Sequence, residues 1–353
     1  MKTFTGNYFE DFELGQVITH GTPRTITQGD NSLYIALTGS RYCIHSAEPV
    51  ARALGFEHMP VDNFLAFHIA FGKTVPDISL NAVANLGYAE VLFRKPLYAG
   101  DTLFVESKVI GLKENSNGKS GIVYVHSIAK DQNLDVAIEW KRWVMVHKRD
   151  TSATTELNST PDLPKHVSAE KLSIPAQLNF SEFEPRLSGS HDLWDDYNIG
   201  EEIDHIDGLT IDESDHTLAT KLYQNNAKVH FNAFEMKSTP GGKRLMYGGH
   251  VISVCRALSH NGLANALYVS AINGGTHANP TYAGDTIYAQ SQVIDKWQVD
   301  SDSHIGAIRV RTVGMKNTKP SDLPSIMVEK EGKQRYHPQV VLDLDYTLLM
   351  PIR

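Results

Sequence analysis

Two histidines in corresponding positions of the chain, His45 and His230, are the residues best suited to transfer a proton. An imidazole titrates close to neutral pH, so either ring could act as a general acid or base. A second feature is the sequence Tyr-Gly-Gly-His at 247–250, just before a predicted helix. Backbone N–H groups at a helix start, uncrowded by side chains, can stabilise a developing oxyanion. Proton transfer beside a polarised carbonyl is the chemistry that these residues offer.

Each of these residues also has a purely structural interpretation. A loop histidine is often only structural, and the repeated position is what favours function for His230. His250 could cap the helix or line the site. Asp62 precedes the first long helix, and we expect it to be an N-cap, because aspartate is strongly favoured there.

The histidines belong to an internal repeat. The sequence Phe-Glu-Asp-Phe at 9–12 recurs as Trp-Asp-Asp-Tyr at 194–197. This match has the same offset, 185 residues, as the two histidines. Pro-Leu-Tyr-Ala-Gly-Asp-Thr at 96–102 recurs as Pro-Thr-Tyr-Ala-Gly-Asp-Thr at 280–286. The last match has an offset of 184, and an offset kept within one residue through separated matches indicates gene duplication. We therefore predict domains at 1–150 and 190–353, joined by a linker at 151–189 that is rich in Ser, Thr and Pro.

Each copy has the same predicted order of elements. Helices at about 61–71 and 250–259 carry an apolar face at helical spacing. Strand-like runs follow, rich in Val, Ile, Tyr and Thr. They lie at 88–94, 102–111, 121–129 and 136–147, and in the second copy at 286–296, 305–316 and 340–349. The predicted fold class is α+β, with an antiparallel sheet wrapped around a central helix in each copy.

Composition limits the function classes. The net charge of −8 argues against nucleic acid as a partner. Two cysteines, Cys43 and Cys255, do not form a zinc or disulfide pattern, and we find no sequence motif for a metal site, a serine hydrolase or a phosphate loop. The first residues are acidic where a signal peptide is apolar, and we see no membrane-spanning run, so we expect a cytoplasmic protein.

The loops that carry the histidines resemble those of the MaoC-like (R)-specific enoyl-CoA hydratases, which read Asp, any residue, Asn, Pro, aliphatic, His. The first copy has Ser40-Arg-Tyr-Cys-Ile-His45, and the second has Asn225-Asn-Ala-Lys-Val-His230. The aliphatic residue and the histidine match in both copies, whereas the aspartate matches in neither. The resemblance implies two fused hot-dog domains.

Three longer phrases, at 75–89, 223–231 and 247–253, are similar to the double hot-dog mesaconyl-CoA hydratases, also called β-methylmalyl-CoA dehydratases. This resemblance implies a hydro-lyase that adds or removes water at a β-hydroxyacyl-CoA. It implies an acyl-CoA thioester as the binding partner, with CoA as part of the substrate and no separate cofactor or metal. Hot-dog sheets often pair further, so a homo-oligomer is one possible state, and the sequence leaves the oligomeric state open.

Hydration of an enoyl thioester needs a proton carrier, an oxyanion donor and a place for the acyl chain. We assign the first role to His230 and the second to the amide of Gly248 or Gly249. Asn225 cannot act as a base, because an amide takes no proton at neutral pH, but it can hold water or a substrate carboxylate. Arg244 and Arg41 are candidates for binding that carboxylate, since guanidinium pairs with it through two bonds.

Three questions stay open at this stage. His45 is either silent or accessory, because Ser40 stands where the acid belongs. A hot-dog acyl-CoA thioesterase is an alternative, with Asp62 as the carboxylate that would activate water. A degenerate pair that binds acyl-CoA without turnover is another. In every case we expect the site to lie where the two copies meet.

Overall fold

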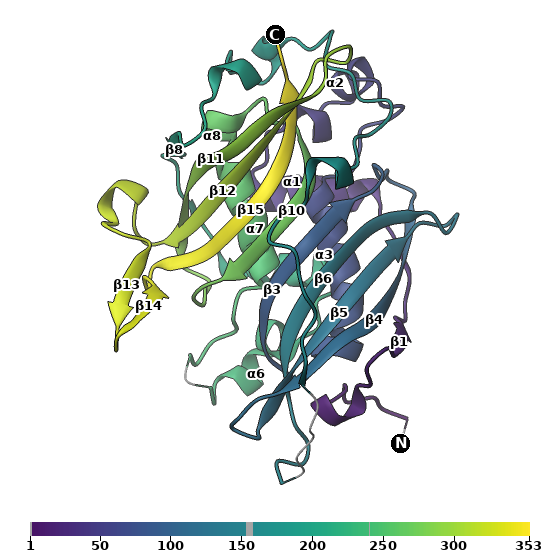
Figure 1. Ribbon diagram of the computed structural model, residues 1–353, viewed down its shortest axis with the longest axis vertical. Helices are drawn as coiled ribbons and strands as arrows, with labels where there is room; N and C mark the ends of the chain where they lie inside the picture. The colour runs from purple at the N-terminus through teal and green to yellow at the C-terminus, as the bar shows by residue number, and fades with distance from the viewer. Residues whose placement is uncertain (1, 153–157, 240) are drawn as a thin grey trace.

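The computed structural model describes residues 2–152, 158–239 and 241–353. Within these ranges the chain forms one large antiparallel sheet of 13 strands, with ten strands in the order β1-β4-β5-β6-β3-β10-β15-β12-β11-β8 and three short strands at its margins (Figure 1). The ten are β1 (Val17–Thr19), β3 (Ala82–Phe93), β4 (Thr102–Glu114), β5 (Ser120–Lys130), β6 (Val136–His147), β8 (Glu202–Asp204), β10 (Tyr268–His277), β11 (Thr286–Asp300), β12 (Ile305–Lys316) and β15 (Val340–Pro351). The three short strands are β2 (Arg24–Thr25), β7 (Asn158–Ser159) and β9 (Leu209–Thr210), and β13 (Met327–Lys330) and β14 (Lys333–Tyr336) form a separate hairpin.

The sheet has two similar halves that meet at one strand pair. Strands β3 to β6 come from the first repeat, and β10, β11, β12 and β15 come from the second. The halves join where β3 and β10 pair antiparallel, with Ala271 opposite Leu92 and Gly275 opposite Tyr88. Strand β10 was not predicted from the sequence. Its Gly274-Gly275 pair interrupts the apolar pattern, yet the strand is needed to make the sheet continuous.

Two central helices, α3 (Asn63–Thr74) and α7 (Gly248–Leu258), pack against the inner face of the sheet and against each other (Figure 1). They begin and end within three residues of the predicted bounds. Phe64 and Phe67 of α3 share one buried cluster with Val251 and Val254 of α7, so the two repeats have a common core. The other helices are α1 (Gln28–Thr38), α2 (Glu48–Ala53), α4 (Glu213–Leu222), α5 (Lys228–Phe231), α6 (Ala233–Met236) and α8 (His260–Leu263).

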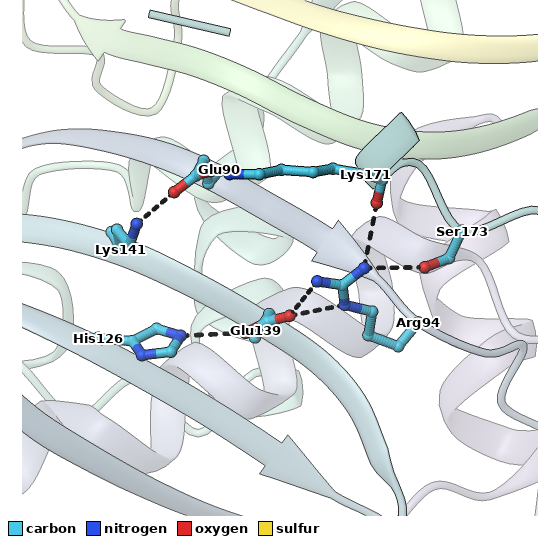
Figure 2. Close-up of polar contacts among 7 residues, drawn as sticks. All are labelled: Glu90, Arg94, His126, Glu139, Lys141, Lys171 and Ser173. Atoms are coloured by element: carbon cyan, nitrogen blue, oxygen red, sulfur yellow. Dashed lines mark hydrogen bonds and ion pairs between the residues drawn. The ribbon is translucent and has the colours of Figure 1, made fainter. Parts of the chain in front are cut away.

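The segment between the repeats packs over the seam of the sheet, which is the β3–β10 strand pair where the two halves meet. Val167 packs with Leu92 and Ala271, one residue from each of the two seam strands. Figure 2 shows the polar contacts nearby, where Lys171 donates to Glu90 at 2.7 Å and the side chain of Ser173 accepts from Arg94 at 3.2 Å. The described part of the predicted linker is therefore held against the sheet by packing and polar contacts, while its residues 153–157 lie outside the described ranges. None of the helices in those ranges is long and apolar enough to span a membrane.

Candidate active site

A cavity of about 290 Å³ lies between the two repeats. The first repeat lines it with Phe71 of α3, Tyr88 of β3 and Arg142 of β6. The second repeat contributes His230 of α5 and Gly248 of α7. Proton-transfer, amide and cationic groups therefore meet in one largely apolar space, as is usual for small-molecule sites.

His230 is held in one orientation by its backbone surroundings. Its Nδ1 lies 2.7 Å from the carbonyl oxygen of Leu245, and a carbonyl can only accept, so Nδ1 carries the proton. Burial lowers the pKa of His230 to about 4, so the ring is neutral at pH 7. Nε2 then has a free lone pair. A neutral imidazole with a fixed tautomer is the form required of a general base.

Helix α7 begins at the cavity with an uncapped end. Its N-cap residue Tyr247 makes no side-chain capping hydrogen bond, and Gly248 lines the cavity. A Cβ at Gly248 would lie 2.5 Å from Nδ1 of His277, and one at Gly249 would lie 2.4 Å from the Tyr247 ring. Both positions thus require glycine for space. The amide of Gly248 is the donor best placed for an oxyanion, whereas Gly249 does not line the cavity.

Asn225 lies in the wall of the same cavity and is only 2% exposed. Its Oδ1 accepts from the backbone N–H of Ala227 at 3.2 Å, which fixes the loop that leads to His230. This loop lies directly on α3, because a Cβ at Gly72 would be 1.9 Å from the backbone oxygen of Tyr223. The close approach of two backbones at Gly72 positions the loop.

The first repeat contains the same arrangement in a closed form. Nδ1 of His45 lies 3.0 Å from the carbonyl oxygen of Pro60, matching the contact of His230, but His45 is only 3% exposed and does not line the cavity. Asp62 caps α3 as expected, since its Oδ1 accepts from the N–H of Phe64 at 2.8 Å. Asn63 occupies the position equivalent to Gly248, and its Nδ2 donates to the carbonyl of Val269 at 2.6 Å. The first helix start is thus already capped and covered.

Three further predicted site residues are not brought to the cavity. Arg244 pairs with Glu213 and donates to Thr217 at 3.0 Å, and Arg41 is exposed on the surface. His250 is buried in the core, where its Nδ1 lies 3.0 Å from the Tyr223 hydroxyl. None of the three lines the cavity. Arg41 and Arg244 were chosen for their charge alone. His250 follows Gly248 by two residues on α7, about 200° around the helix, so it faces the core and not the cavity.

The cavity also contains residues that the sequence analysis missed. His277 lies at the end of β10, with Nε2 3.0 Å from the Tyr88 hydroxyl, and burial lowers its pKa to about 4. Arg142 is only 1% exposed, although it stands in the middle of β6. A signal for Arg142 was present, because it shares the buried alternation of Trp140 and Val144 in a strand whose inward positions are otherwise apolar.

In the described ranges, no group of three or more His, Cys, Asp or Glu side chains is arranged to hold a metal ion.

The chain is similar to known proteins over its whole length. A family model described as mesaconyl-CoA hydratase matches residues 2–322. A β-methylmalyl-CoA dehydratase of Chloroflexus aurantiacus is 52% identical over 352 residues, covering 100% of this chain and 99% of that protein. A mesaconyl-CoA hydratase of Cereibacter sphaeroides is 51% identical over 351 residues, covering 99% and 100%.

Solved structures confirm the expected fold. The crystal structure of a MaoC domain dehydratase from Chloroflexus aurantiacus superposes with a TM-score of 0.95 at 53% identity, covering 100% of this chain and 99% of that one. A Mycobacterium tuberculosis protein with a double hot-dog fold gives a TM-score of 0.77 at 21% identity, covering 98% of both chains. The chain therefore has the double hot-dog fold and belongs to the mesaconyl-CoA hydratase family.

Proposed function

We propose that this protein is a hydro-lyase that interconverts mesaconyl-CoA and β-methylmalyl-CoA by adding or removing water. Relatives that carry these two names match the chain over its whole length. The single observation that supports the chemistry is the neutral His230, fixed through Nδ1 and lining a cavity that the start of α7 also reaches. An imidazole base beside unpaired helix amides is what addition of water to an enoyl thioester requires.

In the hydration direction, Nε2 of His230 takes a proton from water while the water oxygen bonds to Cβ. The π electrons of the Cα=Cβ bond move toward the thioester, and the negative charge collects on its oxygen. The N–H of Gly248 stabilises that oxygen. The enolate then returns its electron pair to Cα and takes the proton from the His230 imidazolium. One water is consumed, and His230 ends neutral.

Asn225 takes the position at which the MaoC-like pattern has an aspartate. Because an amide neither gains nor loses a proton at neutral pH, Asn225 orients the water or the acyl group rather than exchanging a proton. His230 alone then carries the proton in both half-reactions. The same neutral ring starts the reverse reaction, where it removes the proton from Cα.

The test is an absorbance assay of the purified protein with mesaconyl-CoA, crotonyl-CoA and fumaryl-CoA in parallel, with a thiol reagent in duplicate samples. We expect loss of enoyl absorbance with mesaconyl-CoA and no release of free CoA. Thiol release would instead identify a thioesterase. Binding without conversion of any of the three substrates would identify a non-catalytic acyl-CoA-binding protein.

A further inference from the structure

The wall of the active-site cavity contains a buried guanidinium for which the described protein provides no counter-ion. Arg142 is 1% exposed, and no carboxylate in the described ranges pairs with it. Its Nη2 donates to Thr74 at 2.9 Å, whereas Nε and Nη1 are buried without a hydrogen-bond partner. Burial lowers the pKa of Arg142 to about 10, which still leaves it charged at pH 7. A buried, uncompensated charge is costly, so a ligand that compensates it is expected.

A second buried arginine shows what a structural role looks like in this protein. Arg256 is 4% exposed and also lies over an aromatic ring, that of Tyr42. Its Nη1 donates to the Tyr42 hydroxyl at 2.7 Å, and its Nη2 donates to the carbonyl of Ala266. Arg256 leaves no buried nitrogen unpaired and does not line the cavity. Arg142 differs from it in both respects.

A polar neighbour of Arg142 in the cavity wall is also unsatisfied. Both Oδ1 and Nδ2 of Asn85 are buried without a hydrogen-bond partner, and Asn85 lines the same cavity. Asn85 lies on β3, which pairs with β6. Three buried donor nitrogens in one wall, Nε and Nη1 of Arg142 and Nδ2 of Asn85, thus lack acceptors, which fits an anionic group with several lone pairs.

The position of Arg142 relative to the reaction centre also fits. Its guanidinium stacks on the Phe71 ring at 4.2 Å, and that ring lies 5.8 Å from the ring of Tyr247, the N-cap of α7. The Arg142 guanidinium and the start of α7, where the thioester oxygen is proposed to lie, are therefore both close to the Phe71 ring. The acyl chain of mesaconyl-CoA is short and bears its free carboxylate on Cβ, so both ends must be bound within one small cavity.

We infer that Arg142, assisted by Asn85, binds the free carboxylate of the acyl group and restricts the enzyme to enoyl-CoA esters that carry a carboxylate on Cβ. This inference rests on the proposed function, and it replaces Arg41 and Arg244 in the role first given to them. The carboxylate would supply acceptors for Nε and Nη1 of Arg142 and neutralise its charge. An uncharged substrate would leave both groups buried and unpaired.

The test compares mesaconyl-CoA with tiglyl-CoA, in which a methyl group replaces the carboxylate. We expect the wild type to prefer mesaconyl-CoA by at least about 1000-fold in kcat/KM, because a site built for a polar group rejects the analogue that lacks it. Arg142→Met should lower kcat/KM for mesaconyl-CoA at least about 100-fold and leave tiglyl-CoA within about 3-fold, so that the preference collapses. Arg142→Lys, which keeps the charge, should fall between the two.

Arg256→Met is the matched control, since it removes an equally buried guanidinium outside the cavity. It should lower the melting temperature without changing the ratio of the two substrates. Asn85→Ala provides a milder variant should Arg142→Met fail to fold, with an expected loss of about 10-fold for mesaconyl-CoA only. An Arg142→Lys or Asn85→Ala enzyme that is folded and keeps the wild-type ratio would overturn the inference. A wild type that hydrates tiglyl-CoA but not mesaconyl-CoA would instead overturn the proposed substrate.

Discussion

Lowering the pH tests the protonation state of His230 most sharply, because the pKa that burial gives the ring predicts how much activity remains at each pH. The pKa of His230 is lowered from 6.5 to about 4, chiefly by burial. At pH 5 a ring with a pKa of about 4 is still about 90% neutral, whereas an ordinary histidine would be only about 3% neutral. Because the neutral ring starts both directions of the reaction, we expect kcat/KM at pH 5 to be about 0.9 of its value at pH 7. A solvated histidine would give about 0.04.

Stability has to be separated from catalysis in this experiment. The folded-state pKa of His230 lies below the unfolded value, so the unfolded chain binds more protons as the pH falls from about 6.5 to 4, and folding loses free energy across that window. For His230 alone the loss reaches about 2 kcal/mol at pH 5. Burial also lowers the pKa of His205, His250 and His277 to about 4, which adds to the loss.

The assay is therefore a stopped-flow pH jump, with enzyme held at pH 7 and mixed into mesaconyl-CoA at pH 4 to 7. Initial rates are recorded before unfolding, and tryptophan fluorescence follows the fold in the same mixing event. A plateau down to pH 5 is the expected result. A half-loss of kcat/KM near pH 6.5 with the fold intact would refute the account of a buried, neutral ring.

Three substitutions test the surrounding geometry. Gly248→Ala would set a methyl group 2.5 Å from Nδ1 of His277, so we expect kcat/KM to fall at least about 10-fold and stability by about 1–3 kcal/mol, measured by steady-state kinetics and urea unfolding. Unchanged kinetics would show that the start of α7 is not part of the active site. Gly72→Ala would put a methyl group 1.9 Å from the Tyr223 backbone oxygen, so the loop to Asn225 must move, and hydrogen exchange in that loop should rise as activity falls. Asp62→Ala removes the α3 cap and should cost about 1 kcal/mol in thermal unfolding, with kcat within about 2-fold of wild type. A large loss of turnover in Asp62→Ala would instead support the thioesterase alternative, in which Asp62 activates water.

Much of the fold follows from local patterns in the sequence. The bounds of α3 and α7 were predicted to within three residues, because each helix carries an apolar face at helical spacing. Strand β10 was missed, since its glycine pair hides the alternation, although its place could have been derived from the counterpart of β3 in the repeat. The hairpin of β13 and β14 was also missed, because it is polar and has no counterpart in the first repeat.

The site residues also divide into those that local sequence signals reveal and those that only the three-dimensional structure brings together. His230, Asn225 and Gly248 could be found from a loop pattern and a glycine pair, which are local signals. Arg142, Tyr88 and His277 come from strands that only the three-dimensional pairing brings to the cavity. Arg41 and Arg244 failed to reach it because charge alone does not say where a side chain points. The contrast between His45 and His230 depends on what covers each ring, which tertiary packing decides.

The central claim is that one imidazole of the duplicated pair does the chemistry, and paired alanine variants test it directly. Loss of a general base typically costs 100- to 10,000-fold, so His230→Ala should reduce kcat for mesaconyl-CoA hydration by about 1000-fold while the protein stays folded. His45→Ala removes the same ring and the equivalent backbone hydrogen bond from a sealed position, so it should cost about 1–2 kcal/mol of stability and leave kcat within about 2-fold. A folded His230→Ala enzyme with near-normal turnover, or a His45→Ala enzyme that is stable but inactive, would contradict the account.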